Sequence, residues 1–331
     1  MDPRATPQME HDPHRLSDVL RRNKGGDVNY DEITIRRQKN ARVFRIDHPS
    51  FFFPIAVKPV RERAGSAALQ FEALKKVSQA LGEDQQFRVP HPIGVDDSSG
   101  ALLMEWVDLP SLESRLKDWR TPAECALKFV ADSGQWLRRL HDAHHLPDGF
   151  VESKRLLEDL SNALRDLPDL QGKGMLSRFL DTLRRTASPV SKVSVPRGLQ
   201  HGDYKPANVL SGLRSTIGID CHAIYEGLVI VDLGHFLNHL DFTLLAPQGL
   251  PLLPRRERLV SSFLRGYAGP GVAIERAVPC LPLGWLRLHA VTRFWISEAH
   301  LGSWFLRSRY RRWCYRHLGK ILDRELNSFV Q

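Results

Sequence analysis

The stretch LQHGDYKPANVL, residues 199–210, decides how this chain of 331 residues is interpreted. It places His201, Asp203 and Asn208 in the spacing HxDxxxxN, next to apolar residues typical of strands. An aspartate can accept or orient the proton of a hydroxyl group, and an asparagine oxygen can bind magnesium. Lys205 can contact a phosphate or lie on the surface, and His201 is expected to bond to the backbone of its own loop. The stretch therefore predicts a loop that carries chemistry.

Three further residues favour phosphoryl transfer, because the HxDxxxxN spacing is that of a kinase catalytic loop. Lys58 lies in a strand-like run, Glu72 lies in the helical segment that follows, and Asp220 ends a strand twelve residues after Asn208. Lys58, held by an ion pair with Glu72, is expected to contact the nucleotide phosphates. Asn208 and Asp220 are expected to bind Mg²⁺. Asp203 is expected to act as the base or to orient the acceptor hydroxyl, with Lys205 near the transferred phosphate.

The hydrophobic pattern divides the chain into a sheet-rich part and a helical part. The runs EITIRR, ARVFRID, FPIAVKPV and ALLMEWV predict strands, and SAALQFEALKKVSQAL predicts a helix. After Ser111 the pattern is mostly helical, with strand signals at VPRGLQHGD, NVL, TIGID and GLVIV. We expect an α+β, bilobal fold. Its parts are a tail and short helix at residues 1–29, a small lobe with the nucleotide-binding sheet and hinge at 30–107, and a larger helical lobe with the catalytic loop and acceptor site at 108–331.

The chain resembles the aminoglycoside phosphotransferase and choline kinase superfamily from about Asn40 to Tyr267. The resemblance rests on AVK, FEAL, LLMEWVDLPSL, WLRRLHDAH, HGDYKPANVL, IGIDCHAIYEGLVIVDLGHFL and FLRGYA. It implies a protein-kinase-like fold that binds ATP or GTP with Mg²⁺ between two lobes. The hinge that meets the base would consist of Met104, Glu105, Trp106 and Val107. Gly202, where protein kinases usually have arginine, favours the branch that acts on small molecules.

The motif VDLGHF offers a second candidate metal ligand, Asp232, because it resembles the DFG motif of protein kinases. Asp232 lies 24 residues after Asn208, whereas Asp220 lies 12 after it, and a single hairpin needs the shorter distance. Asp220 is therefore the preferred ligand, and Asp232 is expected to be structural, at the start of a helix.

Three other functions remain open after the motifs are compared. A protein kinase would need a long peptide-docking segment, for which the residues between Asp232 and the APQ at 246–248 leave too little chain. A catalytically inactive binding module would not need the complete residue set. A nucleic-acid binder would agree with the pI near 9.6, but no such motif accompanies the charge. The run RRQKNARVF, expected over the phosphates, has no glycine, and the choice between ATP and GTP therefore stays open.

Composition and charge limit the partners and the compartment. The polar N-terminus and short apolar runs predict a cytoplasmic protein, and four scattered cysteines predict neither zinc nor disulfides. The segment between Trp285 and Arg324 has nine basic and two acidic residues, whereas the formal net charge of the whole chain is +9. The acceptor is therefore expected to be neutral or anionic, a sugar or envelope-lipid precursor, and not an aminoglycoside. The basic, aromatic C-terminal helix is expected to pack on its own lobe or to touch a membrane surface.

Overall fold

The computed structural model describes residues 34–37, 43–47, 52–60, 66–96, 100–165, 167, 174–221, 225–300 and 306–329. The predicted tail and helix at 1–29 lie outside these residues. Most of the run expected over the phosphates, at 38–42, also lies outside them, as do Trp304 and Phe305.

The chain forms two compact units. The first consists of Met1–Leu109 and Ile217–Ile224, and the second of Pro110–Thr216 and Tyr225–Gln331. The first boundary falls two residues after the predicted one at Val107. The segment Ile217–Ile224 belongs to the first unit, although a contiguous division assigned it to the helical lobe. Asp220 is thus part of the sheet-rich unit.

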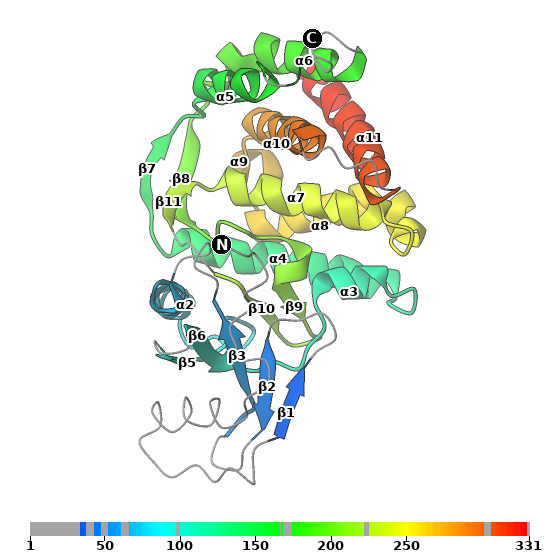
Figure 1. Ribbon diagram of the computed structural model, residues 1–331. Helices are drawn as coiled ribbons and strands as arrows, with labels where there is room; N and C mark the ends of the chain where they lie inside the picture. The colour runs from blue at the N-terminus through cyan, green and yellow to red at the C-terminus, as the bar shows by residue number, and fades with distance from the viewer. Residues whose placement is uncertain are drawn as a thin grey trace. The chain divides into compact units, whose positions relative to one another are not determined.

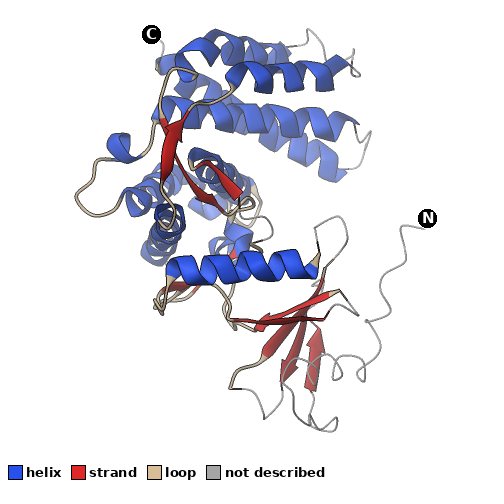
Figure 2. Cartoon of the chain, turned by 90° about the vertical axis from the view of Figure 1, so that its left-hand side faces the viewer, coloured by secondary structure: helices blue, strands red, loops and turns tan. Residues whose placement is uncertain are grey.

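The first unit contains a five-stranded antiparallel sheet in the order β1-β2-β3-β6-β5, drawn as arrows in Figure 2. Ile46, Ile55 and Leu103 have no exposed surface and form its core. Helix α2 packs against β5 and β6, and the Ser66 side chain caps its first turn. The bounds are β1 Thr34–Arg37, β2 Phe44–Asp47, β3 Ile55–Pro59, α2 Ala67–Leu81, β4 Phe87–Arg88, β5 Pro92–Asp96 and β6 Ala101–Glu105.

The second unit is mostly helical, with a three-stranded antiparallel sheet in the order β11-β8-β7. Helix α10 contacts α5, α6, α7 and α11, and Figure 1 shows it between α7 and the α5–α6 pair. The helices are α3 Leu112–Lys117, α4 Ala123–Asp142, α5 Ser153–Arg165, α6 Gly174–Val190, α7 Ile230–Leu245, α8 Arg256–Ala268, α9 Ile274–Ala277, α10 Cys280–His300 and α11 Leu306–Ser328, with 3₁₀ turns η5 Pro206–Asn208 and η6 Leu250–Arg255. The strands are β7 Leu146–Gly149, β8 Val195–Gln200, β9 Val209–Ser211, β10 Thr216–Gly218, which begins here and ends in the first unit, and β11 Tyr225–Leu228.

Helices α4 and α8 pack so closely that each needs a glycine at the contact. A Cβ at Gly134 would lie 2.2 Å from the Phe263 carbonyl oxygen, and one at Gly266 would lie 2.0 Å from that of Ala131. Such distances leave no room for a side chain, so the two glycines determine how closely these helices approach. Since α4 also contacts β8, it supports the strand that leads into the HxDxxxxN stretch.

The predicted strand GLVIV is only partly correct. β11 ends at Leu228, and α7 begins at Ile230, so the apolar run spans a strand end and the first turn of a buried helix. A short apolar run fits both structures, which is why periodicity alone misassigned it. Asp232 does lie in the first turn of α7, as predicted.

The basic C-terminal helix packs on its own unit. Cys314, Leu318, Leu322 and Leu326 are buried along one face of α11, which contacts α10 and α6. Trp313 remains about half exposed. This arrangement is the packed alternative of the two that the sequence left open. Over the residues that the structure describes, every helix is too short or too polar to cross a membrane.

Candidate active site

The HGD loop, which we define as residues 201–208, arranges polar groups around Asp203. Lys205 Nζ lies 2.6 Å from Asp203 Oδ2, and Asn208 Nδ2 donates to the same oxygen at 3.0 Å. Asn208 also donates to the Asp203 carbonyl oxygen at 3.0 Å. On the other side, His235 Nε2 of α7 lies 3.3 Å from Oδ1. Both carboxylate oxygens are therefore held in place by neighbouring side chains.

These neighbours keep Asp203 ionised. Burial by itself would raise the pKa of Asp203, but the contacts with His235 and Lys205 outweigh it, and the net pKa is well below the ordinary value. The side chain is still about one-third exposed. A carboxylate that is ionised at neutral pH and accessible can accept a hydrogen bond from a hydroxyl group.

Asp232 holds the start of the HGD loop. Its carboxylate is buried, and accepts from the backbone N–H groups of His201 at 2.7 Å and Gly202 at 3.0 Å. His141 Nε2 lies 3.2 Å from the same carboxylate, and His141 Nδ1 bonds the Tyr267 hydroxyl at 2.9 Å. Burial would raise the pKa of Asp232, but the contacts with His141 and His201 lower it. Asp232 therefore positions the backbone at the start of the HGD loop.

Buried aromatic rings pack against the HGD loop and within it. Tyr204 is fully buried, stacks on Trp136 with 5.2 Å between ring centroids, and donates its hydroxyl to the Ser133 carbonyl at 2.7 Å. His201 is also buried, and its Nδ1 accepts the Asp203 N–H at 3.4 Å. His201 therefore has the structural role that the sequence indicated.

In the first unit, Lys58 and Asp220 form an ion pair. Lys58 lies in β3 opposite Leu102 of β6, and its Nζ is 2.8 Å from Asp220 Oδ1. Asp220 has φ of +64°, a left-handed conformation that aspartate tolerates better than most residues. Strained backbone of this kind is often found at functional sites. A cation and a carboxylate are thereby brought together from sequence positions 162 residues apart.

The predicted ion pair between Lys58 and Glu72 is wrong in this structure. Glu72 lies on the outer face of α2, with its side chain two-thirds exposed, and pairs with Lys75 at 3.2 Å. The face of α2 toward the sheet carries Ala67, Leu74, Val77, Leu81 and Gln70. Gln70 is buried and lines a small cavity with Lys58 and Asp220, so it occupies the position expected of Glu72.

The four expected hinge residues continue from β6. Met104 lines the same small cavity as Lys58, which agrees with a place near a nucleotide. The Glu105 carboxylate accepts hydrogen bonds from the Arg88 guanidinium group at 2.5 and 2.8 Å. The Trp106 backbone N–H donates to the Pro54 carbonyl at 2.7 Å. The role of Met104, Glu105, Trp106 and Val107 stays a prediction.

Each unit carries an oxygen donor of the kind that magnesium binds. Both described side-chain hydrogen bonds of Asn208 in the second unit use its Nδ2 and not its amide oxygen, and Asp220 in the first unit has a carboxylate paired with Lys58. Magnesium accepts one or two protein oxygens and takes its other ligands from water and phosphate. Within the described ranges no group of three or more His, Cys, Asp or Glu side chains could form an all-protein metal site.

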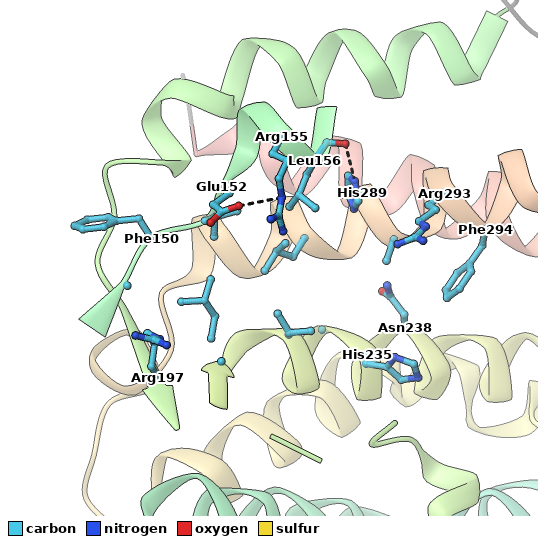
Figure 3. A pocket seen from close by; sticks show the side chains of 18 of the residues that line it. Phe150, Glu152, Arg155, Leu156, Arg197, His235, Asn238, His289, Arg293 and Phe294 are labelled. Atoms are coloured by element: carbon cyan, nitrogen blue, oxygen red, sulfur yellow. Dashed lines mark hydrogen bonds and ion pairs between the residues drawn. The ribbon is translucent and has the colours of Figure 1, made fainter. Parts of the chain in front are cut away.

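A cavity of about 740 Å³ opens in the second unit, and Asp203 adjoins it through His235 without lining it. Its wall includes His235, the residue that contacts the Asp203 carboxylate, as well as faces of α7 and α10. Figure 3 shows His235, Asn238, His289 and Arg293 around this space. Its volume is that of a site for a small molecule.

The structure brings Asp203, Lys205 and Asn208 together in one unit, and Lys58 and Asp220 in the other. Sequence reasoning missed His235 and Gln70. Helical spacing could have found both, because Gln70 shares the period of Leu74 and Val77, and His235 lies one turn after Asp232.

Fold and site together define a kinase-like phosphotransferase. The chain belongs to the phosphotransferase enzyme family, whose model matches residues 34–272. This match, with the structural neighbours below, confirms the kinase-like α+β fold and the resemblance to the aminoglycoside phosphotransferase and choline kinase superfamily. No curated protein matches the chain.

Several solved structures share the fold at low identity. A glucosamine kinase in complex with glucosamine, ADP and inorganic phosphate has a TM-score of 0.61 and 17% identity, covering 91% of this chain and 84% of that chain. Choline kinase LicA from Streptococcus pneumoniae has a TM-score of 0.56 and 13% identity, covering 93% and 99%. Amicoumacin kinase hAmiN in complex with AMP-PNP, Ca²⁺ and Ami has a TM-score of 0.54 and 11% identity, covering 95% and 94%. At these identities, the likeness establishes the fold.

Proposed function

We propose that this protein is a small-molecule kinase that transfers the terminal phosphate of ATP or GTP to a hydroxyl group of its acceptor. The acceptor is neutral or anionic, a sugar or an envelope-lipid precursor, and an amino alcohol is the cationic alternative. The observation that carries the proposal is the ionised Asp203, held by Lys205, Asn208 and His235, the last of which also lines a cavity sized for a small molecule.

The transfer step follows from the groups around Asp203. The acceptor hydroxyl oxygen attacks the terminal phosphorus, the bond to the bridging nucleotide oxygen breaks, and the nucleoside diphosphate leaves. Asp203 orients the hydroxyl and takes its proton. Lys205, which pairs with Asp203 at 2.6 Å, can exchange that contact for the transferred phosphate and stabilise its charge.

The remaining residues serve the nucleotide. Lys58 contacts its phosphates, Asn208 and Asp220 hold Mg²⁺, and Met104, Glu105, Trp106 and Val107 face the base. Bound magnesium neutralises charge on the phosphates. The ion pair of Lys58 with Asp220 supports this role, because the same two side chains can separate to meet a phosphate and a metal. Gln70 lines the same small cavity as Lys58 and is expected to take the orienting role that the sequence assigned to Glu72.

The local fold argues against a protein kinase. Between Asp220 and the APQ at 246–248, the described residues form β11 and then α7 without an extended peptide-docking segment. The presence of Lys58, Asp203, Asn208 and Asp220 argues against an inactive binding module.

A nucleotide screen followed by an acceptor panel tests the proposal. We expect Mg²⁺ with ATP or GTP to raise the melting temperature. Phosphate transfer should then occur to one member of a panel of sugars, amino alcohols and lipid headgroups. Transfer to peptides alone would identify a protein kinase. Nucleotide binding without transfer to any acceptor would identify a binding module.

A further inference from the structure

The cavity next to Asp203 is formed by matching faces of two helices. Residues of α7 and α10 line it at intervals of three and four, which is the spacing of one helical face. The start of α5 and the strands β7, β8 and β11 close one end. Phe150, Leu228, Leu286 and Phe294 give it apolar walls that suit the body of a ring.

The charged side chains of the cavity differ in whether they have an oppositely charged partner. Glu152 pairs with Arg155 at 2.9 Å, and Glu226 lies 3.5 Å from His144. Both glutamates are more than two-fifths exposed, so water screens them. Neither Arg197, which is half-buried, nor Arg293, which is exposed, has a carboxylate partner within the part of the chain that the structure describes.

The backbone of the cavity makes room for Arg197. A Cβ at Gly149 of β7 would lie 2.9 Å from Cδ of Arg197, and 3.4 Å from its Cγ. Glycine at this position therefore leaves space for the arginine side chain. Arg197 comes from β8 and Arg293 from α10, and the two lie toward opposite ends of the cavity in Figure 3.

The other polar groups of the cavity do not offset these cations. Asn238 is bound through both of its amide atoms to Arg287, with distances of 3.0 and 3.1 Å. Burial lowers the pKa of His239 to about 3, and burial also lowers the pKa of His289. Both histidines are therefore neutral near pH 7. His289 donates to the Leu156 carbonyl at 3.2 Å.

The geometry points to an acceptor that carries an anionic group, a carboxylate or a phosphate, bound by Arg197 at one end of the cavity, while Arg293 adds positive charge at the other end. This inference rests on the proposed function, since it takes the cavity as the acceptor site of Asp203. Guanidinium groups bind both anions through paired hydrogen bonds, and an ammonium group would be repelled by them. The apolar walls hold the ring while a hydroxyl group reaches Asp203.

Four hexoses that differ mainly in charge test the inference. Glucuronate, glucose 6-phosphate, glucose and glucosamine are titrated into the full chain by calorimetry. We expect the two anionic sugars to bind at least tenfold more tightly than glucose, and glucosamine to bind most weakly. The stronger of the two anions then identifies the group as a carboxylate or a phosphate.

Arginine variants connect the preference to the cavity. Arg197→Gln should weaken binding of the anionic sugars about tenfold, which is about 1.4 kcal/mol, and Arg293→Gln should weaken it less. Both should leave glucose binding unchanged, and Arg197→Lys should restore part of the loss because it keeps the charge. Arg258→Gln is the matched control, because Arg258 is exposed and pairs with Glu124 on another part of the surface.

Several outcomes would overturn the inference. Glucosamine binding as tightly as glucuronate would do so, as would four indistinguishable sugars, including the case in which none binds. Unchanged anion binding in both arginine variants would also overturn it. Failure of the proposed function looks different: anions would bind through the arginines, yet no phosphate would be transferred. Phosphorylation of glucosamine alone would keep the function and reject the anionic acceptor.

Discussion

Replacement of Asp232 by alanine should destabilise the protein without removing a group that binds metal. The carboxylate is 1% exposed and accepts from the His201 N–H at 2.7 Å, the Gly202 N–H at 3.0 Å and the His141 ring at 3.2 Å. Each buried donor that loses an ionised acceptor costs about 1.5 kcal/mol. His201 and His141 are buried whereas Gly202 reaches solvent, so we expect a loss of about 3 kcal/mol.

Urea and thermal unfolding measure this loss. For a unit of this size, a loss of about 3 kcal/mol corresponds to a decrease of roughly 6–12 °C in melting temperature. Because folding lowers the pKa of Asp232, the parent gains stability from it above the ordinary aspartate pKa, and loses that stability as the pH falls below about 4. Asp232→Ala should therefore show a flatter decrease in stability through this acid range.

Asp220→Ala is the comparison for Asp232→Ala. Asp220 is about one-third exposed, so its removal should change stability by less than about 1 kcal/mol while abolishing magnesium-nucleotide binding. The reverse pattern would refute the assignment. In that pattern, Asp232→Ala is stable but no longer binds magnesium nucleotide, and Asp220→Ala still binds it.

Three further predictions concern the nucleotide site, the buried histidine and the acceptor. Lys58→Met should reduce kcat/KM roughly 100-fold. Gln70→Ala should reduce it about fivefold, the equivalent of about 1 kcal/mol. Glu72→Gln should change kcat/KM less than twofold, because Glu72 only pairs with Lys75 on the surface. If Lys58→Met had the kcat/KM of the parent protein, the first unit would be removed from the assignment. Since burial lowers the pKa of His239 to about 3, the free energy of unfolding should fall by up to about 2 kcal/mol from pH 6.5 to pH 5. Urea titrations should show that His239→Gln abolishes this decrease. Equal slopes of unfolding free energy against pH for the two proteins would contradict the prediction. Kanamycin at micromolar concentrations should not be phosphorylated, and rapid magnesium-dependent turnover of kanamycin without turnover of neutral or acidic sugars would reverse the prediction for the acceptor.

Much of the fold could be predicted because local pattern and tertiary structure agree. The apolar runs in residues 53–60 and 101–107 predict strands, and β3 and β6 form there. Apolar spacing in residues 122–145 predicts a helix, and α4 forms from Ala123 to Asp142. The run at 227–231 was misassigned, because five apolar residues suit a strand as well as a buried helix turn.

The polar contacts of the site were harder to predict. The HxDxxxxN spacing predicted that Asp203 and Asn208 lie together, since a short loop connects them. The partner of Lys58 depends on which face of α2 turns toward the sheet, and that is decided by packing of Leu74 and Val77. Gln70 shares this face, and Glu72 lies two residues further on, pointing outward.

Net charge along the sequence overstated the free positive charge near the C-terminus. Arg287 is buried and pairs with Asp241 at 2.5 Å, and Arg311 pairs with Glu298 at 2.6 Å. Asp241 lies in α7, outside the segment whose charges were counted. A count along the chain cannot include partners that only folding brings near, so the charge of the acceptor is argued better from the cavity.

Transfer of a labelled terminal phosphate tests the central claim most directly. Parent protein and Asp203→Asn are incubated with γ-labelled ATP or GTP, Mg²⁺ and an acceptor from the panel, and the labelled phosphomonoester is counted. We predict magnesium-dependent transfer by the parent and a rate lower by a factor of about 100 or more for Asp203→Asn, at nearly equal stability. Equal rates of transfer by the two proteins would contradict the assignment of Asp203 as the residue that orients and deprotonates the acceptor.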